Sequence, residues 1–339
     1  MHVRTVRHLA AILCLIAAVG FMGRRASAGV AITDPAKAGP DFRVQGEYVG
    51  EANGVNGPEK VGAQVVALGK GEFNATFFAG GLPGAGWNRG DASDIAHGKT
   101  ADGVTKLTGK HTPSGKMFTA TIKDGAMTMT KSNGDPLGEL KKVERKSPTL
   151  GEKPLADAVV LFDGTSAAAW KNGRLVDGDL LNWGVTSKQE FTDYKLHLEF
   201  ECSFMPDARG QGRSNSGVYQ QSRYEVQVLD SFGLPGENDD CGAIYKIANT
   251  RVNMSFPPLN WQTYDIDFTA AKIDSAGKKT ANARITVRHN GVLTIDNVEI
   301  PHPTTAAPIG NEKTNHGPLY LQDHGNPVLY RNIWLVEKK

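Results

Sequence analysis

Two short segments of the chain place a carboxylate, an imidazole and amide side chains at alternate positions. In the segment YEVQVLD, Glu225 and Gln227 alternate with apolar residues, and in the segment PLYLQDHG, Gln322 and His324 share one parity. Side chains two residues apart on a strand point to the same face, about 6.5–7 Å apart. A carboxylate and an imidazole that open on one groove could carry out general acid–base catalysis, and amides could bind hydroxyl groups.

These residues also have purely structural interpretations. Glu225 could be an exposed strand residue that pairs with a Lys or Arg on a neighbouring strand. Gln227 and Gln322 could be solvated, and His324, which precedes a glycine, could cap a turn. The sequence alone leaves both interpretations open.

The elements that must position these side chains are short strands. Apolar and polar residues alternate in many segments after residue 155, and the Asn290-Gly291 dipeptide between two such segments is a strong hairpin signal. The segment NSGVY begins a further strand with Asn215 and Tyr219 on one parity. Strands separated by Gly, Pro and Asn turns are typical of a β-sandwich. No strand–helix–strand unit and no H-E-x-x-H, paired C-x-x-C or G-x-S-x-G motif occurs.

A second β-rich unit precedes this sandwich. Residues 41–145 are rich in glycine, and Phe118–Ile122 and Met127–Met129 flank the turn Lys123-Asp124-Gly125, which predicts a hairpin. We expect a small β-barrel or sandwich, in which Trp87 covers a core edge rather than binding a sugar.

The domain boundaries follow from length and composition. More than 300 residues favour two domains, and the charged segment Leu140–Pro154, with two prolines and a glycine, indicates the linker between them. The predicted organisation is a signal peptide (1–28), a small β-rich domain (29–145), a linker (146–156) and a jelly-roll domain (157–339).

The N-terminal residues are typical of an export signal. Arg4 and Arg7 precede the apolar run Leu9–Met22, and the small-residue triplet Ala26-Ser27-Ala28 follows. The run is shorter than the roughly 20 residues that span a bilayer, which disfavours the alternative of an uncleaved anchor. We therefore expect cleavage after Ala28, a periplasmic or extracellular location, and no membrane span in the mature chain.

The charge of the mature chain does not favour binding to nucleic acid. Cleavage removes four Arg and no acidic residue, so the 38 basic residues fall to 34 against 36 acidic ones and the formal net charge changes from +2 to −2. Neither value provides the basic surplus that nucleic acid or an anionic membrane would require.

Two groups of residues have open alternatives. Cys202 and Cys241 could pair in an oxidising compartment or could be two separate buried thiols. Glu237, Asp239 and Asp240 could bind a cation, because hard cations prefer clustered carboxylates, but a solvated loop is the expected interpretation.

The motifs of the C-terminal part resemble a known family when taken in order. They are Leu161–Gly164 (LFDG), Asn215–Tyr219 (NSGVY), Tyr224–Asp230 (YEVQVLD), Gly242–Tyr245 (GAIY), Trp261–Asp265 (WQTYD), Gly317–Gly325 (GPLYLQDHG) and Arg331–Ile333 (RNI). The set resembles the 3-keto-disaccharide hydrolase family over about residues 157–338. The resemblance implies a concanavalin A-like jelly roll with a concave sugar-binding face.

The chemistry that the resemblance implies is elimination followed by hydration. A ketone at C3 acidifies the C2 proton, so departure of the C1 substituent needs one base, a proton donor to the leaving oxygen, and a cation or hydrogen-bond donors that hold the enolate. Glu225 and His324 are the acid–base candidates, and Asp323 would orient His324 or help to bind a divalent cation of unknown identity. The remaining candidates would hold the carbohydrate: Asn215, Tyr219, Gln227, Tyr245, Trp261 and Gln322.

Two other functions remain as alternatives. A retaining glycosidase on the same fold needs two facing carboxylates, but the even-spaced partner of Glu225 on its strand is Gln227, and the next is Leu229. A non-catalytic carbohydrate-binding module is also possible, because a fold does not settle function. Such a module should bind glycans without turnover and tolerate Glu225→Gln.

Overall fold

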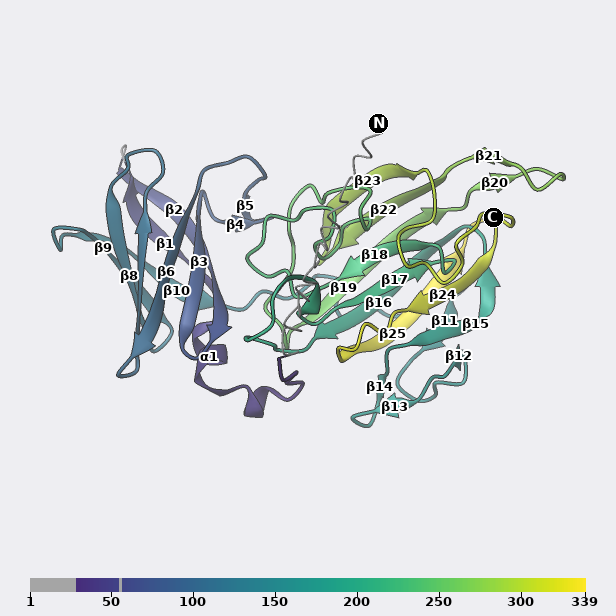
Figure 1. Cartoon of the computed structure of the whole chain (residues 1–339), viewed down its shortest axis with the longest axis horizontal. Coiled ribbons are helices and arrows are strands. Elements are labelled where there is room, and N and C mark those ends of the chain that lie inside the picture. Colours follow the sequence, from purple (N-terminus) through teal and green to yellow (C-terminus); the bar gives the residue numbers. More distant parts are fainter. Residues whose placement is uncertain (1–28, 55–56) are drawn as a thin grey trace, which may run out of the picture.

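The protein consists of a β-barrel and a β-sandwich that lie side by side (Figure 1). The computed structural model describes residues 29–54 and 57–339, and the predicted signal segment lies outside these residues. The helical elements in the described ranges are α1 (Gly39–Val44) and two 3₁₀ turns, η1 (Pro35–Lys37) and η2 (Gly210–Gly212). The prediction of an all-β jelly-roll sandwich preceded by a small β-rich unit is confirmed.

Eight antiparallel strands close the barrel in the order β1-β10-β9-β8-β7-β6-β3-β2. Their bounds are β1 (Gly46–Gly54), β2 (Gly57–Gly69), β3 (Glu72–Ala79), β6 (Ser93–Ala101), β7 (Val104–Lys110), β8 (Met117–Lys123), β9 (Ala126–Lys131) and β10 (Pro136–Val143). The predicted hairpin is present as β8 and β9, and Asp124 and Gly125 at its turn have φ angles of 49° and 78°. The two-residue strands β4 (Leu82–Pro83) and β5 (Gly86–Trp87) pair with each other.

Trp87 covers a core edge, as expected from the sequence. Its ring lies 5.0 Å from that of Phe78 in an edge-to-face arrangement. It also packs against a small apolar cluster of the sandwich, formed by Val252, Met254 and Phe256. Trp87 therefore belongs to the junction between barrel and sandwich.

The sandwich consists of a five-stranded and an eight-stranded sheet. The five-stranded sheet has the order β12 (Trp170–Lys171), β15 (Val185–Phe191), β24 (Gly317–Leu321), β17 (Ser216–Gln220) and β18 (Tyr224–Val228). The eight-stranded sheet has the order β13 (Leu175–Val176), β14 (Leu180–Leu181), β25 (Val328–Glu337), β16 (Tyr194–Cys202), β19 (Trp261–Thr269), β22 (Ala283–His289) and β23 (Val292–Ile300), and β11 (Val159–Phe162) pairs with β25. A separate ribbon joins β20 (Lys272–Ile273) to β21 (Lys279–Ala281).

One apolar core lies between the two sheets. It takes alternate residues from both, such as Tyr224 and Val226 from β18 and Leu198 and Phe200 from β16. The intervening residues of each strand therefore point away from the core, so the sandwich has two outer faces on opposite sides. These two faces carry the polar clusters described below.

The charged segment that predicted a linker is more structured than expected. Leu140–Val143 belongs to β10, where Leu140 is buried in the barrel core, so the first four residues of the charged segment form the end of a strand and not a linker. The boundary at residue 146 stays a prediction. The adjacent charged residues Lys141 and Lys142 break the alternating pattern from which this strand end could have been predicted. Beyond it, the Ser147 hydroxyl lies 2.6 Å from that of Thr263 on β19, which fastens this segment to the sandwich.

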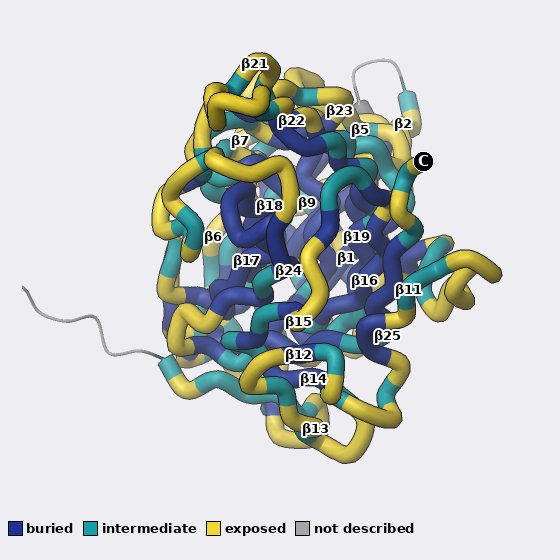
Figure 2. Tube along the Cα trace, turned by 90° about the vertical axis from the view of Figure 1, so that its right-hand side faces the viewer, coloured by how far each residue is buried: buried dark blue, intermediate teal, exposed yellow. Residues whose placement is uncertain are grey.

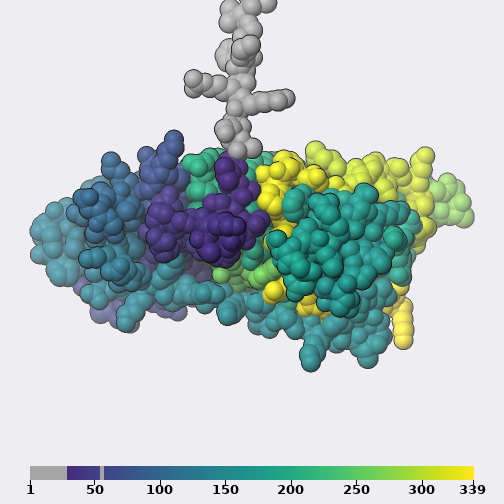
Figure 3. All heavy atoms as spheres, turned by 90° about the horizontal axis from the view of Figure 1, so that it is seen from below, coloured from purple at the N-terminus to yellow at the C-terminus, as the bar shows by residue number. Residues whose placement is uncertain are grey.

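Residues 29–45 lie across the junction of the two units, where Figure 3 shows them in purple. Ile32 and Phe204 exchange two backbone hydrogen bonds of 3.0 and 2.8 Å. Phe204, although it follows the sandwich strand β16, packs in the core of the barrel, and its ring lies 5.4 Å from that of Phe42.

The two cysteines are buried as free thiols. Both lie in the core of the sandwich, and the Cys241 sulfur is 3.0 Å from the Tyr264 hydroxyl. The structure therefore has the second of the two arrangements considered from the sequence.

Candidate active site

Most predicted site residues gather on the outer face of the five-stranded sheet. Glu225 on β18 lies opposite Tyr219 on β17, and Tyr219 lies opposite Tyr320 on β24. Gln227 lies opposite Gly217 in the next row. Figure 2 shows these three strands as buried, with partly exposed loops running around them.

Glu225 is a buried carboxyl group with one side-chain donor. It is 3% exposed, and the Tyr219 hydroxyl donates a 2.7 Å hydrogen bond to its Oε2 atom. The Gln322 amide donates in turn to the Tyr219 oxygen over 3.1 Å. Burial raises the pKa of Glu225 to about 8, while the bond from Tyr219 acts in the opposite direction. The protonated form of Glu225 therefore predominates at neutral pH and can act as an acid.

Gly217 leaves the space that the Glu225 side chain occupies. A Cβ atom at residue 217 would overlap Oε1 of Glu225 and crowd the ring of Tyr219. A glycine in the middle of a strand weakens the strand, and it often marks a place that must accommodate another group. Here it makes room for the carboxyl group.

The segment after β23 covers the Glu225 end of this face. The backbone N–H of Glu225 donates to the Thr304 hydroxyl over 3.0 Å, and the Thr304 N–H donates to Arg223 O over 2.9 Å. The Arg223 side chain then donates to the carbonyls of Asn311 and His316 over 2.7 and 2.9 Å. These bonds hold the segment over the sheet and explain the burial of Glu225.

Gln211 connects Asn215, Gln227 and the loop after β18 at the end of the site away from Thr304. Its Oε1 atom accepts 2.9 Å hydrogen bonds from the side-chain amides of Gln227 and Asn215. Its own amide donates to Asp239 O over 2.9 Å. The sequence did not single out Gln211, and the only signal was its place between two glycines immediately before the Asn215 motif.

Two buried amide oxygens at this face have no hydrogen-bond donor among the described residues. They are Oδ1 of Asn215 and Oε1 of Gln322. A buried polar atom without a partner is costly, so a native structure that keeps one usually has a use for it. Both oxygens could accept hydrogen bonds from hydroxyl groups of a ligand.

His324 and Asp323 lie in the exposed connection between β24 and β25, immediately after Gln322. Asp323 accepts a 2.8 Å hydrogen bond from the Gly325 N–H, as a turn residue does. Within residues 29–54 and 57–339, no hydrogen bond or ion pair joins Asp323 to His324, so the predicted orienting contact is absent. The parity prediction for His324 extended the strand too far, because β24 ends at Leu321.

Tyr245 and Trp261 differ in position. Tyr245 is half-buried beside Glu225, and its backbone N–H donates to Glu225 O over 3.2 Å. Trp261 is on β19 of the eight-stranded sheet, where the guanidinium of Arg331 stacks on its ring at 3.9 Å. The expectation that Trp261 shares a groove with Glu225 is therefore wrong, because an alternating pattern gives the face of a strand but not the sheet to which it belongs.

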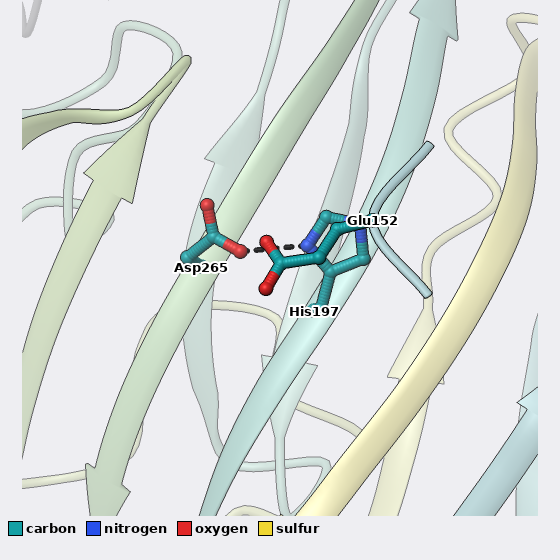
Figure 4. Close-up of side chains that lie close together, drawn as sticks. All are labelled: Glu152, His197 and Asp265. Atoms are coloured by element: carbon teal, nitrogen blue, oxygen red, sulfur yellow. Dashed lines mark hydrogen bonds and ion pairs between the residues drawn. The ribbon is translucent and has the colours of Figure 1, made fainter. Parts of the chain in front are cut away.

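A second polar cluster occupies the outer face of the eight-stranded sheet, on the opposite side of the sandwich. Single ligand atoms of Glu152, His197 and Asp265 all lie within 4.8 Å of one another (Figure 4). Nδ1 of His197 is 2.6 Å from Oδ1 of Asp265, and the imidazole stacks on Trp334 with ring centroids 5.1 Å apart. Burial alone would lower the pKa of His197, but hydrogen bonds to Asp265 and Glu199 raise it to about 9.

The carboxylates of the loop after β18 are engaged with protein groups rather than clustered around a vacant centre. Asp239 pairs with Lys246 at 2.6 Å, and Glu237 pairs with Arg89 at 3.1 Å. Asp240 accepts hydrogen bonds from the backbone N–H groups of Gly236 and Glu237. The carboxylates of Glu237 and Asp239 are thus paired with cationic side chains, whereas that of Asp240 is buried rather than solvated.

The comparison with known families covers the whole sandwich. Residues 157–336 match the 3-keto-alpha-glucoside-1,2-lyase-like domain, which is more than half of the chain. The chain belongs to the 3-keto-alpha-glucoside-1,2-lyase-like domain family. This membership supports a function that acts on carbohydrate, and the resemblance noted from the motifs is confirmed.

The 3-keto-alpha-glucoside-1,2-lyase-like domain contains every predicted site residue, whereas the barrel and Glu152 precede it. Two crystal structures of proteins from Parabacteroides distasonis ATCC 8503, each named as a putative glycosyl hydrolase, are similar to this chain. One is 32% identical with a TM-score of 0.49, covering 54% of this chain and 84% of that one. The other is 14% identical with a TM-score of 0.40, covering 54% and 94%. No curated protein matches the chain.

Proposed function

We propose that this protein is an enzyme that cleaves the glycosidic bond of 3-keto-glycosides by elimination followed by hydration. The observation that supports it most is the buried Glu225 carboxyl, whose pKa is raised to about 8 beside the hydroxyl of Tyr219. A protonated acid is what a departing glycosidic oxygen needs. The free oxygens of Asn215 and Gln322 would accept two hydroxyl groups of the same sugar.

The proposed reaction has two steps. A base removes the C2 proton next to the C3 ketone, the C1–O bond breaks, and Glu225 gives its proton to the leaving oxygen. Water then adds to the resulting enone, with its hydroxyl on C1 and a proton on C2, so the net change is hydrolysis. His324 is our candidate for the base, because its turn follows Gln322 directly and its side chain is exposed. Tyr219 would hold Glu225 in place.

The test is turnover of purified protein on 3-keto-glycosides and on their unoxidised parents, with deuterium uptake at C2 as a second readout. Glu225→Gln and His324→Ala should each lower kcat by at least about 10², the lower range for a general acid or base. Glu299→Gln, which changes an exposed carboxylate of β23, is the matched control and should leave kcat unchanged. Equal cleavage of unoxidised glycosides without C2 exchange would reject the mechanism, and glycan binding without any turnover would favour a non-catalytic module.

Export is a second part of the proposal. The basic start, the short apolar run and the Ala26-Ser27-Ala28 triplet motivate it. The intact mass of the protein recovered from the periplasm or medium should correspond to a chain that begins at Gly29. Recovery of chains that retain Met1 would contradict it.

We also assign the divalent cation considered from the sequence to Glu152, His197 and Asp265 rather than to Asp323. An imidazole and two carboxylates are ligands that Zn²⁺ accepts, and the three side chains converge (Figure 4). The cluster is on the outer face opposite Glu225, so a cation there would fasten the segment of Glu152 to the sandwich and would not contact the substrate.

A further inference from the structure

Two long loops of the sandwich contact both the barrel and the candidate site. One comprises residues 203–215, between β16 and β17, and the other comprises residues 229–260, between β18 and β19. Ordering each residue of a loop costs about 1–2 kcal/mol of conformational entropy, so loops of this length need fixed attachments to keep one conformation. The barrel provides attachments for both.

The loop 203–215 is anchored on the β2–β3 end of the barrel. The Arg209 guanidinium donates to Leu68 O over 2.7 Å, and that of Arg213 donates to Ala67 O over 3.2 Å. Arg213 is buried and also donates to Asp230 of the second loop over 2.6 Å. A single side chain thus connects the barrel to both loops.

One arginine of the barrel, Arg89, binds the loop 229–260 through hydrogen bonds and an ion pair. Arg89, in the connection between β5 and β6, donates to the carbonyls of Pro235 and Gly236 over 2.8 and 2.5 Å. It also pairs with the Glu237 carboxylate at 3.1 Å. Three acceptors on consecutive residues leave this part of the loop little freedom.

Between these anchors the two loops meet at Gln211. Its side chain bonds to Asn215 and Gln227 of the candidate site and to the Asp239 carbonyl, which lies two residues beyond the segment that Arg89 holds. The Gln227 amide is also 3.4 Å from the same carbonyl. The position of Gln211, and through it the orientation of Asn215, therefore depends on how both loops sit on the barrel.

We infer that the barrel, which lies outside the family domain, positions the Gln211 end of the carbohydrate site through Arg89 and Arg213. In this arrangement Asn215 binds a sugar hydroxyl through its free oxygen, and Gln211, Arg89 and Arg213 are positioning residues, of which Gln211 fixes the orientation of the Asn215 amide. The inference rests on the proposed function for the identity of the ligand, but not for the coupling between barrel and loops.

The test uses the full chain with Arg89→Ala, since Arg89 is partly exposed and its removal leaves no buried charge unpaired. Arg251→Ala is the matched control, because Arg251 is in the same loop and pairs with Asp296 at the same distance of 3.1 Å, and its side chain has no hydrogen bond or ion pair with the described residues of the barrel. Hydrogen exchange of residues 234–241 should become faster by on the order of tenfold in Arg89→Ala only. Exchange at residues 303–316, which cover Glu225, should not change.

Kinetics with a 3-keto-glycoside separate positioning from catalysis. Arg89→Ala and Gln211→Ala should each raise KM roughly fivefold, the effect of losing one modest interaction, with kcat within about twofold. Arg89→Lys, which can still donate to one carbonyl, should recover part of the loss. Gln211→Ala should raise KM without accelerating exchange at residues 234–237, which Arg89 holds.

Each outcome bears on one claim only. Unchanged exchange at residues 234–241 in Arg89→Ala overturns the coupling between barrel and loop, whatever the activity. Faster exchange with an unchanged KM overturns the role of Gln211 in binding. Absence of turnover by the unmodified protein on every 3-keto-glycoside rejects the proposed function, and the exchange comparison then still decides whether the barrel holds the loop.

Discussion

Glu225 differs from an ordinary surface carboxylate in its solvation. Water is replaced by the Tyr219 hydroxyl and by the segment that contains Thr304, so ionisation would leave a charge with a single side-chain donor. Removing an ionised group from water costs more than removing its neutral form, which is why the pKa rises. Burial likewise raises the pKa of Tyr219, and the neighbouring Glu225 raises it further, so both groups keep their protons at neutral pH.

This shift predicts a pH dependence of stability. The pKa of Glu225 is raised from 4.5 to about 8 in the folded protein, so between these values the folded state binds more protons than the unfolded state. The protonated Glu225 therefore contributes to the free energy of unfolding, and this contribution is fully present below about pH 4.5 and is lost as the pH rises through about 8. Between these values the free energy of unfolding falls by at most about 1.4 kcal/mol per pH unit. Activity should fall over the upper part of that range, as the acid form disappears.

Urea unfolding at pH 5, 6.5 and 8 measures the effect. The free energy of unfolding should fall less steeply with pH in Glu225→Gln than in the unmodified protein, because Gln cannot ionise. Glu299→Gln should keep the slope of the unmodified protein. Parallel curves for Glu225→Gln and the unmodified protein would show that Glu225 is ionised in the folded state and would remove the general acid from the mechanism.

At the residue level, strand parity predicted which side chains share a face but not what covers them. Glu225, Gln227 and Gln322 reach one face because alternation along a strand is a local property. The burial of Glu225 was not predictable, since it depends on Thr304 and its segment, some 80 residues away in the chain. Gln211 was missed for the same reason, because it lies in an irregular loop without a periodic pattern.

At the scale of elements, the turn between β22 and β23 both joins two strands and packs against the segment that follows the barrel. Asn290 and Gly291 have φ angles of 51° and 78°, as a two-residue hairpin turn requires. A Cβ atom at residue 291 would overlap the ring of Pro148. Gly291 is therefore required both for the conformation of the hairpin turn and for close packing against Pro148.

Gly291→Ala should destabilise the protein by about 1–3 kcal/mol. A left-handed conformation costs a residue with a side chain roughly 1–2 kcal/mol, and the clash with Pro148 adds to this. Gly277→Ala is the matched control, because Gly277 has a φ of 76° in the exposed turn between β20 and β21 with nothing within 4 Å of a Cβ. Equal losses in chemical denaturation would show that the contact with Pro148 contributes nothing.

Elements were predictable where their signals are local. The β8–β9 and β22–β23 hairpins were found from turn residues between alternating runs. The end of strand β10 was not predicted, because Leu140 is the only buried residue of Leu140–Val143 and two adjacent lysines follow it without an alternating pattern. The sequence did not decide whether the N-terminal unit is a barrel or a sandwich. A closed barrel requires β1 to pair with β10, and these are the first and last strands of the unit in the sequence.

At the scale of the whole molecule, the sandwich carries one polar cluster on each outer face, and each is tied to a different part of the chain. Gln211 and Asn215 connect the Glu225 face to loops held by the barrel. The opposite face binds the segment that leaves the barrel, through the Gly151 N–H, which donates to Glu199 over 2.6 Å, and the Glu152 carbonyl, which accepts from Asn332 over 2.9 Å. The barrel is thus attached on both sides of the sandwich.

A divalent cation at Glu152, His197 and Asp265 should strengthen the second attachment. Binding to the folded chain alone stabilises it by mass action, by about 2.7 kcal/mol when the free cation is at 100 times its dissociation constant. Zn²⁺ added to chelator-treated full-length protein should therefore raise the unfolding temperature, and calorimetry should detect one site. Glu152→Gln should weaken binding and reduce the shift, whereas Glu144→Gln, an exposed carboxylate outside the cluster, should not. The assignment fails if Zn²⁺ does not raise the unfolding temperature of the unmodified protein, or if it raises that of Glu152→Gln by as much. In either case the cluster is an ion-pair network in which the His197 imidazolium pairs with Asp265 and Glu199, and the segment of Glu152 is held by its hydrogen bonds alone.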